Sequence, residues 1–385
     1  MKQIIEKYEI FKVNPRWVFL KIYTKEGLTG FGEPVIEGRS DSVIACVKEL
    51  MDSYLIGKNA LDINDHWNVL YRGGFYRGGP ILMSALSGID QALWDIKGKF
   101  FNVPVYELLG GKCRDSIRAY SWVGGDRPSD TGDMALDRKN KGFSAVKMNA
   151  TEELQYIDSY EKIDQVLERV SSIREKCGKN FGIGIDFHGR VHKPMAKVLA
   201  KKLEEFDPMF IEEPVLCENY ESFEDIAKIT SIPIATGERL FSRWDFKKIF
   251  HQGAVSIIQP DASHAGGITE VVKIAAAAES YDIALALHCP LGPVALASCL
   301  QIDAVSYNAV IQEQSIAIHY NKGCDVLDYI KNKEVFNFKD GYLSIPNLPG
   351  LGVDIDEEKL KEESKKVEDW KNPIWRHKDN SFAEW

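Results

Sequence analysis

Acidic residues and a histidine recur at a nearly constant interval through the second half of the chain. Six such residues follow one another at spacings of 23 to 27 positions. A strand, a helix and the loops between them together take about 25 to 30 residues, so each of the six should follow a strand at the same edge of a parallel sheet. A single acid there is usually a helix cap, but capping does not require carboxylates and an imidazole to recur in register. The six residues are Asp186, Glu212, Glu238, Asp261, His288 and Glu313.

Three of these carboxylates predict a divalent-metal site. Asp186, Glu212 and Glu238 follow consecutive strands, where like charges would repel one another unless a cation lay between them. Oxygen ligands suit Mg²⁺ or Mn²⁺ better than zinc, and three protein ligands leave coordination positions open for a substrate. Glu213 is expected to point to the opposite side of its strand and to pair with a lysine of a neighbouring unit.

Two histidines and one further acid predict acid–base chemistry beside the metal. His188 comes two residues after Asp186, so we expect both side chains to project to the same side of the strand. His288 ends the seventh strand and Asp261 ends the sixth, and a carboxylate beside an imidazole fixes its tautomer and raises its basicity. Asp261 and His288 together therefore indicate a general base. The third and seventh strands of an eight-stranded ring lie opposite each other, so His188 and His288 should face each other across its mouth.

A cation between two such histidines suits removal of a proton next to a carboxylate. The enediolate that forms carries its charge on the carboxylate oxygens, and a divalent cation offsets that charge. The second histidine then either returns a proton to the other face, which is epimerisation, or protonates a β-hydroxyl, which is dehydration. Residue types and spacing do not choose between these reactions. A third alternative is an inactive barrel with a binding or structural role, although such a protein has no physical reason to retain like charges in one mouth.

The elements that position these residues alternate between strand-like and helical segments. Eight short apolar stretches are separated by amphipathic helical ones, which predicts parallel strands that close into an α/β barrel. We expect a modified TIM barrel, (β/α)7β, over residues 116–325. The predicted strands are Ile117–Trp122, Phe143–Asn149, Phe181–Phe187, Met209–Glu212, Ile232–Glu238, Val255–Pro260, Ile283–His288 and Asn308–Glu313.

Residues 1–115 have a different pattern, that of an α+β capping domain. Arg16–Thr24 and Leu28–Glu33 flank a turn and predict a hairpin, and residues 41–54 predict a helix. Pro80 opens a long apolar helix, 81–99, whose wide apolar face indicates burial between neighbours. We expect the C-terminal segment, 326–385, to pack back on this domain and complete it.

Composition narrows the class of protein. The chain has 385 residues, enough for two domains, and a net charge of −9, which argues against binding to nucleic acid. No apolar run approaches the length of a membrane span. The seven cysteines are scattered singly, without a C-x-x-C pair, which favours a reducing compartment, the cytoplasm.

Several motifs resemble the enolase superfamily, in its mandelate racemase and muconate-lactonizing branch. The apolar helix 87–99 followed by Glu107-Leu108-Leu109-Gly110-Gly111 is typical of that branch. Within it, the chain is similar to the bacterial galactonate dehydratase family over essentially its whole length. The stretches that carry this likeness are 32–39, 76–80, 120–128, Asp186-Phe187-His188-Gly189-Arg190, Ile211-Glu212-Glu213-Pro214, 259–267, His288-Cys289-Pro290-Leu291-Gly292-Pro293 and 375–380.

The resemblance implies a role for each site residue. Asp186, Glu212 and Glu238 would bind Mg²⁺, or Mn²⁺ in its place. His288, tuned by Asp261, would take the C2 proton of D-galactonate, and His188 would expel the C3 hydroxyl to give 2-dehydro-3-deoxy-D-galactonate. Glu313, while protonated, would hydrogen-bond the substrate carboxylate. Racemases of the branch carry Lys-x-Lys on the second barrel strand, with the second lysine as a base, whereas this chain reads Lys147-Met148-Asn149 and so lacks that base.

Substrate choice is expected to depend on the cap loop 33–39 and on arginines and aromatics that suit a polyhydroxylated acid. The candidates are Arg16, Arg39, Tyr76 and Trp122. The nearest alternative is a dehydratase of another aldonate, such as gluconate or mannonate, and a further one is a sugar-acid epimerase. The partners expected are a small sugar acid and copies of the same chain, as a dimer or octamer.

Overall fold

The computed structural model describes residues 2–385, and its largest feature is a ring of eight parallel strands. Successive strands pair from β4 to β10, β11 pairs with β4, and a bridge between Leu285 and Ala309 closes the ring. All eight predicted strands are confirmed, although the last five keep ladder pairing over only two or three residues. The strands are β4 (Ser116–Val123), β5 (Ala145–Asn149), β6 (Gly182–Asp186), β7 (Phe210–Glu212), β8 (Ile234–Thr236), β9 (Ile257–Ile258), β10 (Ala284–Leu285) and β11 (Gln312–Glu313).

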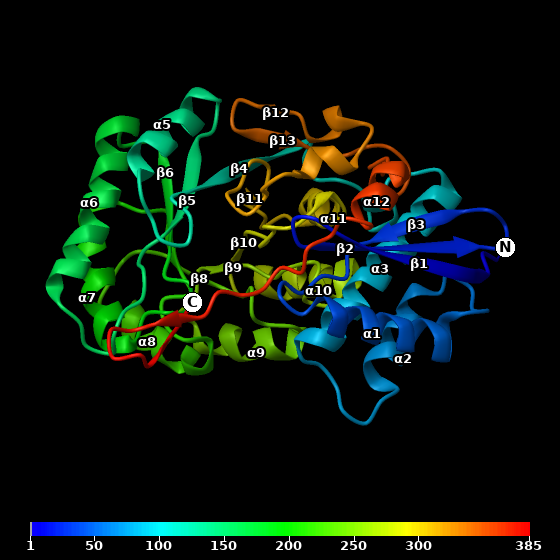
Figure 1. Cartoon of the computed structure of the whole chain (residues 1–385), viewed down its shortest axis with the longest axis horizontal. Coiled ribbons are helices and arrows are strands. Elements are labelled where there is room, and N and C mark those ends of the chain that lie inside the picture. The colour runs from blue at the N-terminus through cyan, green and yellow to red at the C-terminus, as the bar shows by residue number, and fades with distance from the viewer. Residues whose placement is uncertain (1) are drawn as a thin grey trace.

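Seven helices connect these eight strands, which confirms the predicted (β/α)7β barrel. They cover the outside of the ring (Figure 1). The shortest is α8, a single turn that follows a 3₁₀ segment, Cys217–Ser222. The seven are α5 (Thr131–Asn140), α6 (Tyr160–Cys177), α7 (Lys193–Leu203), α8 (Phe223–Ala227), α9 (Arg243–Gln252), α10 (Gly267–Glu279) and α11 (Pro293–Val305).

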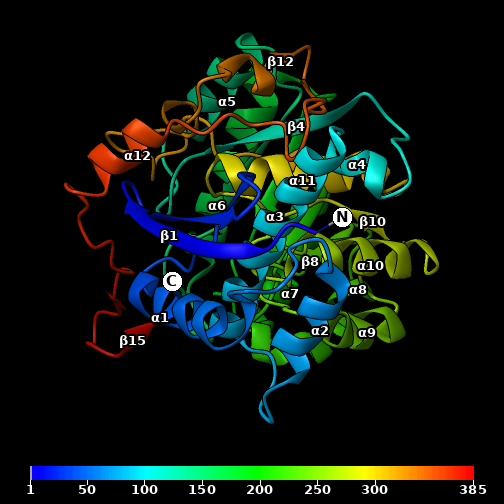
Figure 2. The ribbon, with the colours of Figure 1, turned by 90° about the vertical axis from the view of Figure 1, so that its right-hand side faces the viewer.

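The N-terminal part forms a cap of three antiparallel strands and several helices. Figure 2 shows the molecule with this cap towards the viewer. The predicted hairpin and the helix after Pro80 are confirmed, and the predicted helix 41–54 ends in a π-helical turn, Met51–Leu55. Helix α2 was not predicted. The elements are β1 (Ile5–Val13), β2 (Trp17–Thr24), β3 (Thr29–Gly32), α1 (Ser40–Leu50), α2 (Ile63–Arg72), α3 (Pro80–Phe101) and α4 (Val105–Leu108).

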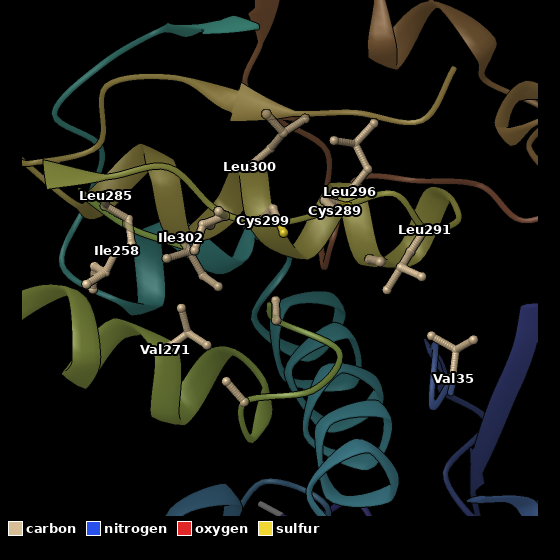
Figure 3. Packing of buried hydrophobic residues seen from close by; sticks show 14 of the residues in the cluster. Val35, Ile258, Val271, Leu285, Cys289, Leu291, Leu296, Cys299, Leu300 and Ile302 are labelled. Carbon is tan, nitrogen blue, oxygen red and sulfur yellow. The ribbon is translucent and has the colours of Figure 1, made fainter. Parts of the chain in front are cut away.

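Helix α3 is buried between the cap sheet and the barrel helices, as its wide apolar face predicts. Two glycines let β3 lie directly against it, because a Cβ on Gly32 would come within 1.7 Å of the carbonyl oxygen of Gly88. On its other side, the Trp94 indole donates to Thr269 of α10 at 2.8 Å. Figure 3 shows the packed layer around α11, including Leu296 and Cys299. The cap is therefore fixed to the barrel through an extensive shared core.

The C-terminal segment contacts both parts of the molecule. Strand β13 (Tyr342–Ser344), which pairs with β12 (Phe338–Lys339), adds antiparallel to β4 of the barrel. Helix α12 (Glu357–Glu363) instead lies on the cap, where Lys21 pairs with Glu357 at 2.6 Å. The chain then crosses the mouth of the barrel, shown in red in Figure 1, through a small hairpin of β14 (Trp375–Arg376) and β15 (Phe382–Ala383).

The division into a cap of 1–115 with 326–385 and a barrel of 116–325 stays a prediction.

None of the helices in residues 2–385 combines the length and the apolar character that crossing a membrane requires.

One buried carboxyl group in α11, that of Asp303, predicts a stability that depends on pH. Asp303 is fully buried, and neither of its carboxylate oxygens has a hydrogen-bond partner among the described residues. Burial raises the pKa of Asp303 to about 8, although Arg114 acts to lower it. A carboxyl whose folded pKa is raised stabilises the fold at acid pH and loses that contribution as pH rises from about 4 towards 8.

We therefore expect the unfolding free energy of the wild type to fall more steeply between pH 5 and 8 than that of Asp303→Asn. The difference in slope should be at most about 1.4 kcal/mol per pH unit. Denaturant unfolding at several pH values measures it, with Asp115→Asn, an exposed aspartate, as the control. Parallel pH curves for Asp303→Asn and the wild type would contradict the assignment.

Candidate active site

The acids and histidines predicted from the spacing gather at one rim of the barrel. Asp186 and Glu212 are partners in the β6–β7 register, and Asp261 and His288 form a bridge between their strands. Glu238 follows β8 by two residues. Above this rim lies a cavity of about 370 Å³ that is walled by all three parts of the chain. Its lining includes Trp122, His188, Glu238, Arg239 and His288 from the barrel, Arg16, Ile36 and Glu37 from the cap, and Asn372 and Trp385 from the C-terminal segment.

His288 and Asp261 form the expected dyad. The Nδ1 atom of His288 lies 2.7 Å from Oδ2 of Asp261, and the other oxygen of Asp261 accepts from the Ser263 amide at 2.6 Å. The Nε2 atom of His288 lies 3.0 Å from Glu238. Burial would lower the pKa of His288, but the carboxylates of Glu238, Glu313 and Asp261 raise it well above its ordinary value. The dyad thus fixes Nδ1 as a donor and directs Nε2 towards the rim of carboxylates.

His188 reaches the cavity by a route that differs from the one expected. We expected it to share a strand face with Asp186, but β6 ends at Asp186 and His188 has a φ of 55°, in the left-handed region. The Arg190 guanidinium donates to Nδ1 of His188 at 2.9 Å and is itself held by the carbonyls of Asp126 and Thr151. Nδ1 is therefore an acceptor, and Nε2 carries the ring proton. Burial and then the charge of Arg190 lower the pKa of His188 to about 3, so the free protein holds this ring neutral.

A buried lysine that the sequence analysis did not assign to the site holds the rim together. Lys147 of β5 is fully buried and lies 2.8 Å from both Glu212 and Glu313 and 4.0 Å from Asp186. Burial would lower the pKa of Lys147, but Glu212 and Glu313 raise it well above its ordinary value. Its charge therefore offsets part of the repulsion in the cluster. The signal that could have found it is a lysine inside the apolar strand, where an unpaired charge is costly.

The three carboxylates fit an oxygen-ligated cation by their chemistry. One oxygen of Asp186, Oδ2, is buried without a hydrogen-bond partner among residues 2–385, which leaves it free for a ligand. Burial and the nearby charge of Glu212 raise the pKa of Asp186 well above its ordinary value, so the cluster lacks positive charge. The Glu238 carboxylate is paired with the His288 ring. Within the described chain no three acid, histidine or cysteine side chains are arranged to enclose an ion, and Glu238 lies 3.0 Å from Nε2 of His288.

Glu313 is surrounded by hydrogen-bond donors. Its Oε1 accepts from the Trp122 indole and forms an ion pair with Nζ of Lys147 at 2.8 Å, and its Oε2 accepts from the Cys289 amide at 2.9 Å. Its expected contact with a substrate carboxylate stays a prediction.

Glu213 is turned away from the metal cluster as expected, but its partner is an arginine, not a lysine. Arg239 donates to it at 2.7 Å, and the Thr236 hydroxyl and the Gly237 amide donate to its other oxygen. Arg239 comes from the next β/α unit, directly after Glu238. The pair therefore ties the loops after β7 and β8 together.

Two of the four predicted substrate contacts lie at the cavity and two do not. Arg16 and Trp122 line it, and the Arg16 guanidinium is fixed by Glu37 at 3.1 Å and by the carbonyl of Pro290 at 2.8 Å. Arg39 is exposed at the start of α1, and Tyr76 lies in an exposed loop with 88% of its surface accessible. Neither Arg39 nor Tyr76 lines this cavity in the single chain.

Two family models match most of the chain. Residues 12–110 match the N-terminal domain model of mandelate racemase and muconate lactonizing enzyme, and residues 130–359 match the enolase C-terminal domain-like model. The chain belongs to the enolase superfamily. A D-galactonate dehydratase of Ralstonia pickettii (strain 12J) is 59% identical over 383 residues, which is 99% of this chain and 100% of that protein.

Solved structures of the enolase superfamily share the whole fold. An enolase from Agrobacterium radiobacter, solved with sodium and L-malate bound, superposes with a TM-score of 0.90 at 29% identity and covers 99% of each chain. A member of the enolase superfamily from Salmonella Typhimurium has a TM-score of 0.85 at 30% identity and covers 93% of this chain and 97% of its own.

The buried ion pairs of Lys147 yield a stability prediction. Lys147→Met keeps the apolar stem but leaves Glu212 and Glu313 without a cation, so we expect a loss of about 3–5 kcal/mol of unfolding free energy. Adding Glu313→Gln to this variant removes one of the uncompensated charges and should restore part of the loss. Denaturant unfolding of metal-free protein measures both effects. Equal stability of Lys147→Met and the wild type would show that the lysine carries no such charge balance.

Proposed function

We propose that this chain is a D-galactonate dehydratase, a hydro-lyase that converts D-galactonate to 2-dehydro-3-deoxy-D-galactonate and water. The observation that carries the proposal is the pair His188 and His288, which line one cavity above a rim of buried carboxylates. The full-length likeness to a D-galactonate dehydratase supports the choice of substrate. A base on one wall and a proton donor on the other suit removal of a proton from C2 and of a hydroxyl from C3.

His288 is the base in this mechanism. Its Nδ1 is fixed by Asp261 at 2.7 Å, so Nε2 is the nitrogen that takes the C2 proton. Asp261 stabilises the imidazolium that results. Nε2 is paired with Glu238 here, so the base acts once Glu238 has another partner.

His188 assists the departure of the C3 hydroxyl. Arg190 holds Nδ1 and leaves the Nε2 proton facing the cavity. An anionic sugar acid in the cavity raises the pKa of this histidine, because a nearby negative charge favours its charged form. The charged ring carries a proton on Nδ1 too, so Arg190 no longer donates to that nitrogen in this state. The charged ring then gives its Nε2 proton to the leaving hydroxyl, which departs as water, and the ring returns to its neutral form.

The acid end of the substrate belongs at the floor of the cavity, near Lys147, Glu313 and the three carboxylates. Members of the superfamily use Mg²⁺. We propose that Asp186, Glu212 and Glu238 hold Mg²⁺, or Mn²⁺, which when bound offsets the charge that builds on the substrate carboxylate as the C2 proton leaves. Lys147 keeps Glu212 and Glu313 oriented for this task.

The metal assignment predicts a loss of cation affinity in Asp186→Asn. Replacing one charged ligand should weaken Mg²⁺ binding by at least about tenfold, the range that even the hydrogen-bond partners of metal ligands reach. Calorimetric titration of Mg²⁺ into metal-free protein measures this, with the exposed Asp115→Asn as the control. Unchanged Mg²⁺ affinity in Asp186→Asn would remove that residue from the site.

A panel of sugar acids separates the proposed activity from its rivals. D-galactonate should give the 2-keto acid faster than D-gluconate or D-mannonate. In His188→Asn, keto-acid formation should be lost while C2 of D-galactonate still exchanges with deuterium from the solvent, and His288→Asn should lose both. Product from gluconate or mannonate alone would favour another aldonate dehydratase, and inverted substrate without keto acid would favour an epimerase. No C2 exchange in His188→Asn would overturn the assignment of His288 as the base.

Localisation and assembly are proposed from the composition of the chain and from its family. We place the enzyme in the cytoplasm, as its cysteine usage suggests, and expect a homo-oligomer, a dimer or an octamer. Its partners are then a small sugar acid and copies of itself, without nucleic acid or membrane.

A further inference from the structure

The last part of the chain crosses the mouth of the barrel, and we call residues 364–385 the C-terminal strap (Figure 1). It is anchored at its start, where Asp369 pairs with Lys12 at 2.5 Å and the Glu368 amide donates to the Asn14 side chain at 3.2 Å. It is anchored again in its hairpin, where the Trp375 ring faces the guanidinium of Arg190 at 4.8 Å. The strap is therefore a packed wall of the site.

The strap carries two tryptophans into a series of rings that ends on His188. Tyr320 and Trp370 have ring centroids 6.2 Å apart, Trp370 and Trp385 are 5.9 Å apart, and Trp385 meets His188 edge-on at 5.9 Å. Trp385 also lines the cavity. A residue far from the barrel strands in sequence thus stands against one of the two histidines of the proposed reaction.

The indole nitrogen of Trp385 is unpartnered. Its N–H is buried, and no acceptor lies within hydrogen-bond distance among residues 2–385. Buried tryptophan N–H groups usually find an acceptor, because an unsatisfied donor retains its full desolvation cost. A ring that lines a cavity with a free donor can be satisfied by a ligand in that cavity.

The orientation of the substrate decides which of its groups this donor meets. Glu313, which is fully buried with Lys147 and Glu212, lies directly behind Trp122 and His288 of the cavity lining. In the proposed function the acid end of a sugar acid belongs at that end of the cavity. The hydroxylated chain must then rise from the reacting carbons towards the strap. Trp385 stands on that upper wall beside His188.

We infer that Trp385 is a specificity-determining residue: its indole N–H donates to the terminal hydroxyl of the sugar acid, and its ring packs against His188. The inference rests on the proposed function for the orientation of the substrate. The C-terminal strap would then distinguish six-carbon from five-carbon sugar acids. This role is separate from those of the acid–base and metal residues.

The test compares two acids that differ only at the far end. L-Arabinonate is D-galactonate without its C6 carbinol group and has the same configuration at C2, C3 and C4. Trp385→Phe keeps an aromatic wall and removes only the donor, so kcat/KM for D-galactonate should fall about threefold to tenfold, chiefly through KM. The value for L-arabinonate should stay within twofold of the wild type. Trp244→Phe, the same replacement on α9 outside the cavity, is the matched control and should change neither.

A binding measurement keeps the inference separate from the proposed function. The affinities of both acids, with Mg²⁺ present, are measured by calorimetry on His288→Asn with and without Trp385→Phe, so that turnover plays no part. Loss of affinity for D-galactonate alone supports the role of Trp385 even if wild-type turnover of D-galactonate is absent, an outcome that would overturn only the proposed function. An equal effect on both acids, or no effect on either, overturns the role of Trp385 while leaving a measured dehydratase activity intact.

Discussion

The charge balance at the barrel rim is the constraint on which the rest of the site depends. Three carboxylates, those of Asp186, Glu212 and Glu313, lie within 4.0 Å of one buried lysine, Lys147, and two of them are only 2.8 Å away. One positive charge cannot offset the repulsion among all of them, and the raised pKa of Asp186 reflects this deficit. A divalent cation held by Asp186, Glu212 and Glu238, as proposed, would supply the missing positive charge.

The cap holds the two loops that carry Asp261 and His288, the proposed base dyad. Glu33, at the end of β3, is fully buried and accepts from the Gly292 amide at 2.6 Å and the Ala295 amide at 2.9 Å, at the start of α11. Its own amide donates to Gln91 of α3, whose side chain donates to the carbonyl of Ala262 beside Asp261. The loop after β9 and the loop after β10 are thus tied to the same point of the cap. A displacement of the cap would therefore move both members of the dyad.

The sequence predicts the parts of this site that follow from repetition. A β/α unit has a nearly constant length, so the spacing of Asp186, Glu212 and His288 was enough to place them at one rim. His188 shows where that reasoning stops, since a left-handed turn, not strand alternation, brings it into the cavity. Trp385 could not be predicted at all, because its place depends on how a hairpin near the end of the chain packs on Arg190. Long-range packing leaves no local pattern in the sequence.

The two histidines are held in opposite states, and ligands must reverse both. In the free protein, burial and Arg190 keep His188 neutral, whereas Glu238 and its neighbours favour the charged form of His288. A base must begin neutral and an acid must begin charged, so neither ring is yet in the state that its proposed role requires. Glu238 holds the His288 proton less tightly once its charge is shared with a cation, and an anionic substrate beside His188 offsets the charge of Arg190. The first change would lower the pKa of His288 and the second would raise the pKa of His188, as a base and an acid require. The proposed cation and the sugar acid would therefore both balance the charge at the rim and prepare the two histidines.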